Sequence, residues 1–502
     1  MLAASIRISS PRALFVDLNN FSRYPTVGVG YIARALRKAG WMVDILSPLA
    51  EGVRGVTREP RATLARRILE RANQAAAHSS LQLVRRLRGA AASLGQRRFL
   101  ASCSRVASYV ARALDHARYD CVLVSAYLMY FPVCESIGFL CNQHGLPLII
   151  GGAYLNQPEV AEQWRGLRGL TALVGGEPEM CVADLVSAAA QGHALGAFPG
   201  VVLPDGRTGP KPTPLHDLDA VPFPDYEGFP WDRYPRAIVP VISGRGCGWS
   251  ACSFCSDITS SSGRTFRSRS VANVLDEIGW QSQRHGASRF VFTDLKLNSS
   301  AEVWNGILHG MPSRVADPRW IAAVHVDAAK DSSLSADTLR AARAAGCVRL
   351  TTGLESGSQR VLDAMHKGTD VARNSSFVKD AAAAGISVRV TLVLGYPGEE
   401  AHDVARTARF LRDHETSLDR VSINRFRMIT GTTIHRQVER HPDSIRGLRI
   451  VGHDHRHATL NHAYTPAYSR AYSSAVADVL DAAHRINRRE LRHAARDFEG
   501  VM

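Results

Sequence analysis

The sequence has no long apolar run. Near its start only "ALFV" precedes Asp17, which is too short for a secretory signal or a membrane-spanning helix. We therefore expect a cytoplasmic protein without membrane contact. Nine cysteines, an odd number in 502 residues, favour reduced thiols and metal ligation over a disulfide framework. The apolar fraction of 45% is that of an ordinary folded chain, so disorder is not expected.

The net charge of +15 comes mostly from arginine, and much of that arginine lies in residues 54–118. Such a surface suits nucleic acid, an anionic substrate, or an acidic electron carrier such as a flavodoxin or ferredoxin. Solvated faces of Arg- and Ala-rich helices explain the same composition. Charge alone does not decide between these interpretations.

The first part of the chain alternates strand and helix patterns. Short β-branched runs at 13–18, 42–47, 121–126, 147–153 and 172–176 are separated by amphipathic stretches. This pattern predicts an α/β, doubly wound, Rossmann-like domain over 1–202, with an Arg-rich helical insertion at 54–117. Residues 203–235 are rich in proline and predict an extended linker.

A second alternation follows the linker. Its strand patterns lie at 237–243, 290–294, 321–326, 348–355, 387–395 and 420–428. Six such units predict a partial (β/α)6 barrel over 236–440, followed by a helical extension over 441–502. Functional residues of such barrels lie at the carboxyl ends of the strands. Asp294, Glu355 and Gly395 end three of these runs, so they are expected to converge.

The stretch "SGRGCGWSACSFCSD" places Cys247, Cys252 and Cys255 directly after the first of these strands. Three clustered thiols can hold three irons of a four-iron cluster, or a zinc ion if folding recruits a distant histidine. Unligated buried thiols are a third possibility. Zinc would suit a basic nucleic-acid-binding protein, which leaves the convergence of the strand-end residues unexplained.

Longer segments of the sequence resemble the radical S-adenosylmethionine (SAM) superfamily. These are "CSFC", "TTGLESGSQRVLDAMHKGT" and "VTLVLGYPGEEAHDVARTARFL". "YPTVGVGYIARALRKAGWMVDIL", "LIIGGAY" and "VGGEPEMCVADLV" are similar to the N-terminal domain of the subclass that binds cobalamin. Two departures stand out: four residues, rather than the usual three, separate Cys247 from Cys252, and the Asp-x-His-x-x-Gly motif that supplies an axial histidine is absent.

The resemblance implies a [4Fe-4S] cluster on the three cysteines, where SAM is cleaved reductively to a 5′-deoxyadenosyl radical. It further implies cobalamin-dependent C-methylation of a small-molecule or peptide substrate, with non-methylating radical chemistry on a vestigial cobalamin domain as the alternative. A nucleic-acid substrate is less expected. The SAM-binding residues that the resemblance implies are Phe254, Asp294, Glu355, Ser356 and Arg389, and those for cobalamin are Thr26, Gly28, Ser125, Gly151, Gly152 and Tyr154.

The residues themselves leave other roles open. Arg389 would also suit a salt bridge lining the barrel, and Glu355 an acid at a helix start. The His-rich segment 453–462 could bind metal, but a solvated basic segment is expected.

Overall fold

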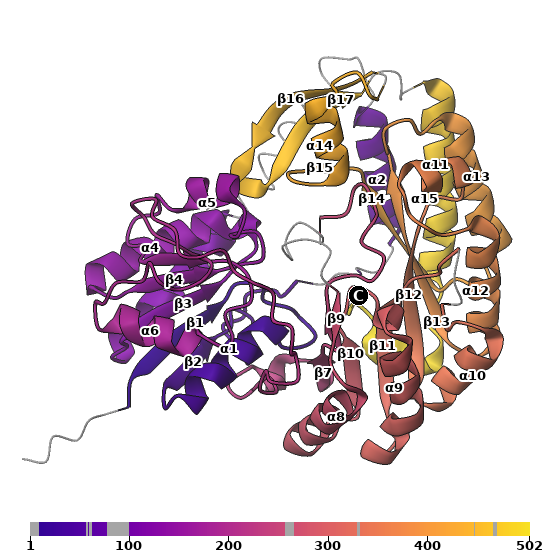
Figure 1. Cartoon of the computed structure of the whole chain (residues 1–502). Helices are drawn as coiled ribbons and strands as arrows, with labels where there is room; N and C mark the ends of the chain where they lie inside the picture. Colours follow the sequence, from indigo (N-terminus) through magenta and orange to yellow (C-terminus); the bar gives the residue numbers. More distant parts are fainter. Residues whose placement is uncertain are drawn as a thin grey trace, which may run out of the picture. The chain divides into compact units, whose positions relative to one another are not determined.

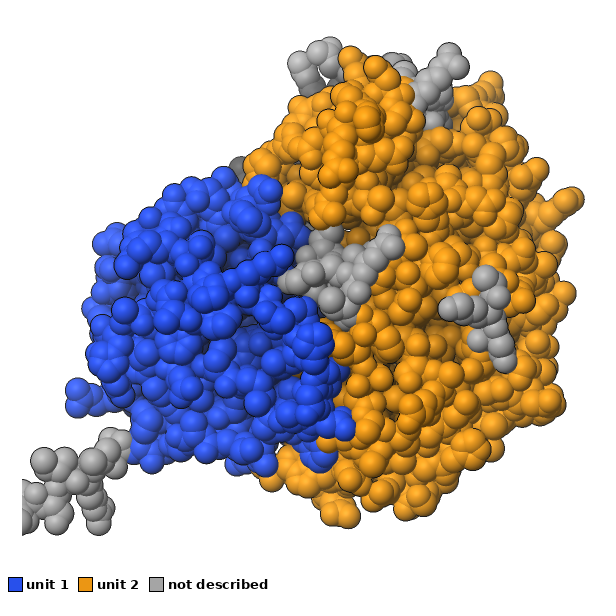
Figure 2. All heavy atoms as spheres, viewed as in Figure 1, with its two compact units in different colours: residues 1–56, 98–234 blue, residues 57–97, 235–502 orange. Residues whose placement is uncertain are grey.

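The computed structural model describes residues 10–56, 59, 63–77, 100–256, 266–328, 332–445, 447–464 and 469–501. The chain divides into two compact units, distinguished by colour in Figure 2. Unit 1 comprises residues 1–56 and 98–234, and unit 2 comprises residues 57–97 and 235–502.

Unit 1 is built on one six-stranded sheet with the order β2-β1-β3-β4-β5-β6. Its strands are β1 (Arg12–Asp17), β2 (Met42–Leu46), β3 (Cys121–Ser125), β4 (Leu148–Gly151), β5 (Ala172–Val174) and β6 (Val201–Val202). The first five run parallel and β6 is antiparallel at the edge. Helices α1 (Val27–Lys38), α4 (Phe131–His144), α5 (Pro158–Trp164) and α6 (Val182–Ala190) belong to it, as do helical residues 100–116 (Figure 1). The predicted doubly wound fold is confirmed, with its strand order reversing between β1 and β3.

The proline-rich segment differs from the predicted linker. It is extended as expected, but it packs on unit 1 up to residue 234. Tyr226 is fully buried, and a Cβ on Gly30 of α1 would lie only 2.6 Å from its ring. Asp225 pairs with Arg37 at 3.0 Å. Apolar side chains between the prolines account for this packing, because they gain from burial even where no regular element forms.

Unit 2 contains six parallel strands in the order β14-β13-β12-β11-β10-β7. They are β7 (Ile238–Val241), β10 (Arg289–Phe292), β11 (Arg319–Val324), β12 (Cys347–Glu355), β13 (Ser387–Leu394) and β14 (Arg420–Arg425). The helices of this unit include α8 (Val271–His285), α9 (Ala301–Arg314), α10 (Ala336–Ala344), α11 (Gln359–Ala364), α12 (Val371–Ala383) and α13 (Ala401–Asp413) (Figure 1). β7 contains Pro240, which lacks a backbone donor and fits a strand at the sheet edge. The predicted partial barrel is confirmed.

The Arg-rich insertion contributes a helix to unit 2. Helix α2 (Leu64–Ala77) packs beside α15 (Arg470–Arg488), as Figure 1 shows. Arg67 lies 3.1 Å from Asp481 of α15, and Arg71 binds the same carboxylate. Part of the arginine surplus is therefore neutralised within the fold.

The C-terminal extension differs from the helical expectation over residues 448–464. This segment forms β16 (Leu448–Asp454) and β17 (Thr459–Tyr464), joined by the short helix η4 (His455–His457). Together with β15 (Met428–Ile429) they make a three-stranded antiparallel sheet. Burial alternates along β16, but Val451 stands on the exposed face and Gly452 and Asp454 on the more buried one, which hides this period in the sequence. Helix α15 agrees with the expectation.

No helix in the described ranges combines the length and apolar character that crossing a membrane requires.

Candidate cluster and cofactor sites

The cysteine loop leaves the barrel at the carboxyl end of β7. Strands β8 (Gly244–Arg245) and β9 (Arg267–Ser268) pair antiparallel and close its base. Asp294, which follows β10, fixes the start of this loop. Its buried carboxylate accepts hydrogen bonds from the Ser243 hydroxyl at 2.7 Å and from the Gly244 N–H at 2.8 Å. Burial raises the pKa of Asp294 to about 6, against these hydrogen bonds. The partners of Asp294 are thus protein groups, whereas the resemblance implied a contact with SAM.

The fourth residue between the first two cysteines is accommodated by a tight turn. Ser250 has a left-handed backbone (φ +48°), and its hydroxyl donates to the carbonyl of Cys247. Trp249 points out of this turn. Its Nε1–H donates to the His366 carbonyl at 2.9 Å, and its ring stacks on His325 with 6.0 Å between ring centroids. The unusual spacing therefore places an anchoring tryptophan within the loop.

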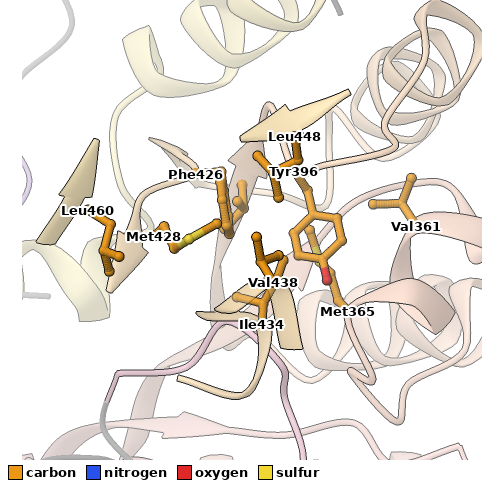
Figure 3. Packing of buried hydrophobic residues seen from close by; sticks show 10 residues of the cluster. Val361, Met365, Tyr396, Phe426, Met428, Ile434, Val438, Leu448 and Leu460 are labelled. Atoms are coloured by element: carbon orange, nitrogen blue, oxygen red, sulfur yellow. The ribbon is translucent and has the colours of Figure 1, made fainter. Parts of the chain in front are cut away.

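The second half of the loop rests on an apolar core. Ser253 donates its N–H to the Met365 carbonyl at 2.9 Å, and its hydroxyl lies 2.8 Å from the Tyr396 hydroxyl. Phe254 packs edge-on against Tyr396 with 6.4 Å between centroids. The core itself, drawn in Figure 3, consists of Val361, Met365, Val393, Tyr396, Phe426, Met428, Ile434, Val438, Leu448 and Leu460. The strands that the sequence did not predict, β15 to β17, thus help support the cysteine loop.

Two lysines act on the thiols. Burial raises the pKa of Cys252, and Lys367 is the strongest opposing charge. Burial also acts against the charge of Lys367 itself, but Glu355, Cys252 and Cys255 outweigh it and raise the pKa of the ammonium group. The pKa of Lys296 is lowered by burial, although Cys247 and Asp327 oppose the shift. Thiolates at this site would therefore face cationic neighbours.

His325 is held in its neutral form beside these lysines. It follows β11, and burial, reinforced by Lys367 and Lys296, lowers its pKa to about 3. The imidazole thus adds a ring for Trp249 to stack on, but no charge.

Glu355 ends β12 with a left-handed backbone (φ +56°), next to a register shift between Gly353 and Glu355. Its side chain is buried and lies 3.1 Å from Lys367 Nζ. Helix α11 begins only at residue 359, so Glu355 is not an acid in a first helical turn. The hydroxyl of Ser356 lies 3.3 Å from that of Thr407 on α13. A non-glycine residue in this conformation is strained, and such strain is concentrated at functional sites.

Arg389 lies at the amino end of its strand. It is the third residue of β13, roughly 16 Å from the carboxyl end at Leu394 at ~3.3 Å per residue. Its Nε lies 4.0 Å from Glu59, which also pairs with Arg349 at 2.8 Å and with Arg420 at 3.5 Å. The structure therefore places Arg389 in the barrel-lining salt bridge that the sequence left open.

The donor set on the loop fits an iron–sulfur cluster. Among the described residues, no three His, Cys, Asp or Glu side chains converge on one point that could hold a single metal ion. Three thiolates on one loop match the ligands of a four-iron cluster that keeps one iron open. Cys247, Cys252 and Cys255 are partly exposed and share one anchored loop, while five of the other six cysteines are buried.

Unit 1 offers a second candidate site at the carboxyl ends of β1, β3 and β4. The side chain of Asn19 donates to the Ser125 hydroxyl at 3.2 Å, and Thr26 donates to Asp17 at 2.8 Å. Ser125 is the register partner of Gly151. This edge is the switch point of the sheet, where doubly wound folds bind their ligands.

The remaining residues predicted for this site lie around the same edge. Gly152 follows β4, and a Cβ there would lie 2.8 Å from the Ala126 carbonyl, so only glycine fits. Tyr154 comes two residues later and is partly buried. Gly28 is exposed in the first turn of α1.

Residues 241–411 match the radical SAM superfamily. That segment, about a third of the chain, is similar to a radical SAM domain. It is 26% identical over 272 residues, 53% of this chain and 57% of the relative, to an uncharacterized methyltransferase of Pyrococcus horikoshii. It is 27% identical over 49% of this chain and 45% of the relative to the anaerobic magnesium-protoporphyrin IX monomethyl ester cyclase of Rubrivivax gelatinosus. The chain thus spans about half the length of these curated relatives.

Two solved structures share its fold over nearly the whole chain. The radical SAM methyltransferase TsrM of Kitasatospora setae matches with a TM-score of 0.63 at 16% identity, covering 94% of this chain and 89% of that one. The cobalamin-dependent radical SAM enzyme OxsB matches with a TM-score of 0.62 at 16% identity, covering 91% and 65%. Both units of this chain therefore have counterparts in those folds.

Sequence reasoning did not single out several residues of these sites. Lys367, His325 and Trp249 surround the three cysteines of the loop, and Asp17 anchors the edge of unit 1, where burial raises its pKa to about 6. Asp17 lies near the end of the predicted strand 13–18, so its position could have been recognised from the sequence. Lys367 lies inside the quoted segment "MHKGT", but only the folded loop shows what it faces.

Proposed function

We propose that this radical SAM enzyme cleaves SAM reductively at a [4Fe-4S] cluster held by Cys247, Cys252 and Cys255, and uses cobalamin to methylate a carbon of a small-molecule or peptide substrate. When bound, the cluster and SAM supply a 5′-deoxyadenosyl radical and cobalamin supplies a methyl carrier. The observation that carries the proposal is the anchored loop of three thiols at the carboxyl end of β7, facing two lysines.

The chain's own residues prepare this site. Asp294 fixes where the loop leaves the barrel, and Trp249 and Ser253 hold it against the segment that follows α11. Phe254, on the same loop, is proposed to lie beside SAM. Glu355 stands at the carboxyl end of β12 in a strained conformation, which supports a role at the SAM site.

Cobalamin is assigned to the switch-point edge of unit 1. Thr26, Ser125, Gly151 and Gly152 border that edge, and Tyr127 beside it is 46% exposed. Glycines let a large ligand approach the backbone, and exposed aromatic surface suits the apolar face of a corrin. The fold shared with TsrM and OxsB, whose solved structures contain cobalamin, adds support.

The positive net charge of the chain supports a proposal for its electron donor and its substrate. An acidic flavodoxin or ferredoxin is proposed as the reductant, and the substrate is proposed to be a small molecule or peptide of secondary metabolism, for which an anionic character would suit the basic chain. The net charge of +15 supports an acidic electron donor. A cytoplasmic location belongs to the same proposal.

The test is to purify the chain without oxygen, reconstitute it with iron, sulfide and hydroxocobalamin, and count iron, zinc and cobalamin. SAM and a reductant are then added, and 5′-deoxyadenosine is measured. About four irons, bound cobalamin and SAM cleavage that disappears in Cys255→Ala are expected. Cys181→Ala, which removes a partly buried cysteine of unit 1, is the matched control.

Two other results would change the proposal. Iron and SAM cleavage without bound cobalamin would favour non-methylating radical chemistry. Zinc without cleavage would overturn the radical enzyme altogether.

A further inference from the structure

We infer that Lys367 tunes the cluster electrostatically. Its positive charge, held in place by Glu355, raises the reduction potential of the iron–sulfur centre. This inference rests on the proposed function, because it requires the cluster on the cysteine loop. It concerns the electron that must enter the cluster before SAM can be cleaved.

The first step is the placement of the lysine. The segment 365–368 is fastened to the cysteine loop at two points. Trp249 Nε1 donates to the carbonyl of His366, and Ser253 N–H donates to the carbonyl of Met365, both at 2.9 Å. Gly368 lies against the Trp249 ring so closely that a Cβ there would clash with it. Lys367 is therefore held between these anchors, next to the loop that carries the thiols.

The second step is the orientation of its side chain. Lys367 is buried, with 9% exposure, and its Nζ lies 3.1 Å from Glu355 Oε1. Apart from Glu355, the opposite charges that act on it most strongly are Cys252 and Cys255. The ammonium group thus pairs with the Glu355 carboxylate and is close enough to two of the proposed cluster ligands to interact with their charge.

The third step is that the backbone is specialised for this pair. Glu355 adopts a left-handed conformation, and Gly353 lies directly beneath the pair. A Cβ on Gly353 would lie 2.6 Å from Lys367 Nζ and would overlap the carboxylate. A side chain at position 353 would therefore push the ion pair away, and the strained backbone of Glu355 is kept in the same place.

The consequence is electrostatic. Reduction adds a negative charge to a cluster already bound by three thiolates, and a nearby cation in a water-poor site stabilises that charge. Glu355 works in the opposite direction, but it acts on Cys252 more weakly than Lys367 does. The two partners should therefore shift the potential with opposite signs, which loss of packing would not do.

The experiment compares the reduction potentials of loaded variants in the absence of SAM, followed by the EPR signal of the reduced cluster. Lys367→Met should lower the potential, so that the ratio of reduced to oxidised cluster at a fixed potential falls about tenfold, or about 59 mV for one electron. Glu355→Gln should raise it. Lys367→Arg should stay close to the wild type. Lys379→Met, on the exposed face of α12, is the matched control and should change nothing.

The alternatives give distinct results. An unchanged potential in Lys367→Met together with weaker SAM binding would overturn the inference and assign the lysine to the SAM carboxylate. Shifts of the same sign in Lys367→Met and Glu355→Gln would also overturn it, in favour of a structural role. If Lys367→Met fails to retain iron, the sign of the shift in Glu355→Gln decides. Failure of the wild type to bind a cluster would overturn the proposed function itself.

Discussion

Glu59 is expected to be among the most sensitive single positions for the stability of unit 2. Its carboxylate faces three arginines at the amino end of the barrel: Arg349 at 2.8 Å, Arg420 at 3.5 Å and Arg389 at 4.0 Å. The side chain of Glu59 is 9% exposed and that of Arg349 is fully buried. Removing one partner of a buried ion pair costs about 3–5 kcal/mol, because the other charge stays behind without water. Glu59→Gln should therefore lower the free energy of unfolding by about 3 kcal/mol.

Calorimetry tests this expectation. A loss of that size corresponds to a melting temperature lower by about 5–10 °C for a domain of this class. Glu490→Gln is the control, since the Glu490 side chain is 84% exposed and surface pairs contribute about 1 kcal/mol or less. Adding Arg349→Met to Glu59→Gln should recover part of the loss, because it removes the stranded charge. An unchanged melting temperature in Glu59→Gln would refute the reasoning.

Three further outcomes are expected. Gly353→Ala should keep its circular dichroism and its iron but lower the reduction potential of the cluster, since a Cβ would displace Lys367 Nζ, whereas Gly279→Ala, which meets nothing within 4 Å, should behave as the wild type. Burial raises the pKa of Glu399 from 4.5 to about 7, so the folded state binds the proton more tightly and stability should fall as pH rises from about 4.5 to 7; in Glu399→Gln the melting temperature should lose this slope, and an identical pH profile would contradict the assignment. Trp249→Phe, which keeps the ring and loses its hydrogen bond, should weaken the loop by about 1 kcal/mol and release iron severalfold faster than the wild type.

The strands of both sheets could be predicted because their apolar periodicity is strong and turn residues separate them. The hairpin over 448–464 could not, because in its first strand apolar Val451 is exposed while Gly452 and Asp454 stand at the more buried positions. The extended segment 203–230 was recognised, but its packing on α1 depends on isolated apolar residues such as Tyr226, which have no period. Hydrophobic periodicity predicts helices and strands, but it does not predict how segments without regular secondary structure pack.

The sites show a similar division. The cysteine loop and the strand ends could be predicted because parallel strands bring their carboxyl ends together. The pattern predicted that Arg389 lies on a barrel strand, and the structure places it near the amino end of β13. A sequence pattern indicates which face of a strand a residue occupies, but it does not indicate which ligand lies at that level of the barrel. The position of Lys367 depends on a hydrogen bond from Ser253 to Met365, two residues that are 112 positions apart in the sequence. No local sequence pattern predicts such a contact.

Residues 57–97 belong to unit 2, although they interrupt the sequence of unit 1. Neither unit is therefore encoded by one continuous segment that could be transferred to another protein on its own. A fragment that begins at Pro235 would contain all six barrel strands but would lack α2 and Glu59, so its arginines would have lost their carboxylate and α15 its neighbour. Recombination or engineering that moves this barrel to another protein must carry 57–97 with it. The boundary that matters for modular reuse thus lies at two places in the gene and not only at the proline-rich segment.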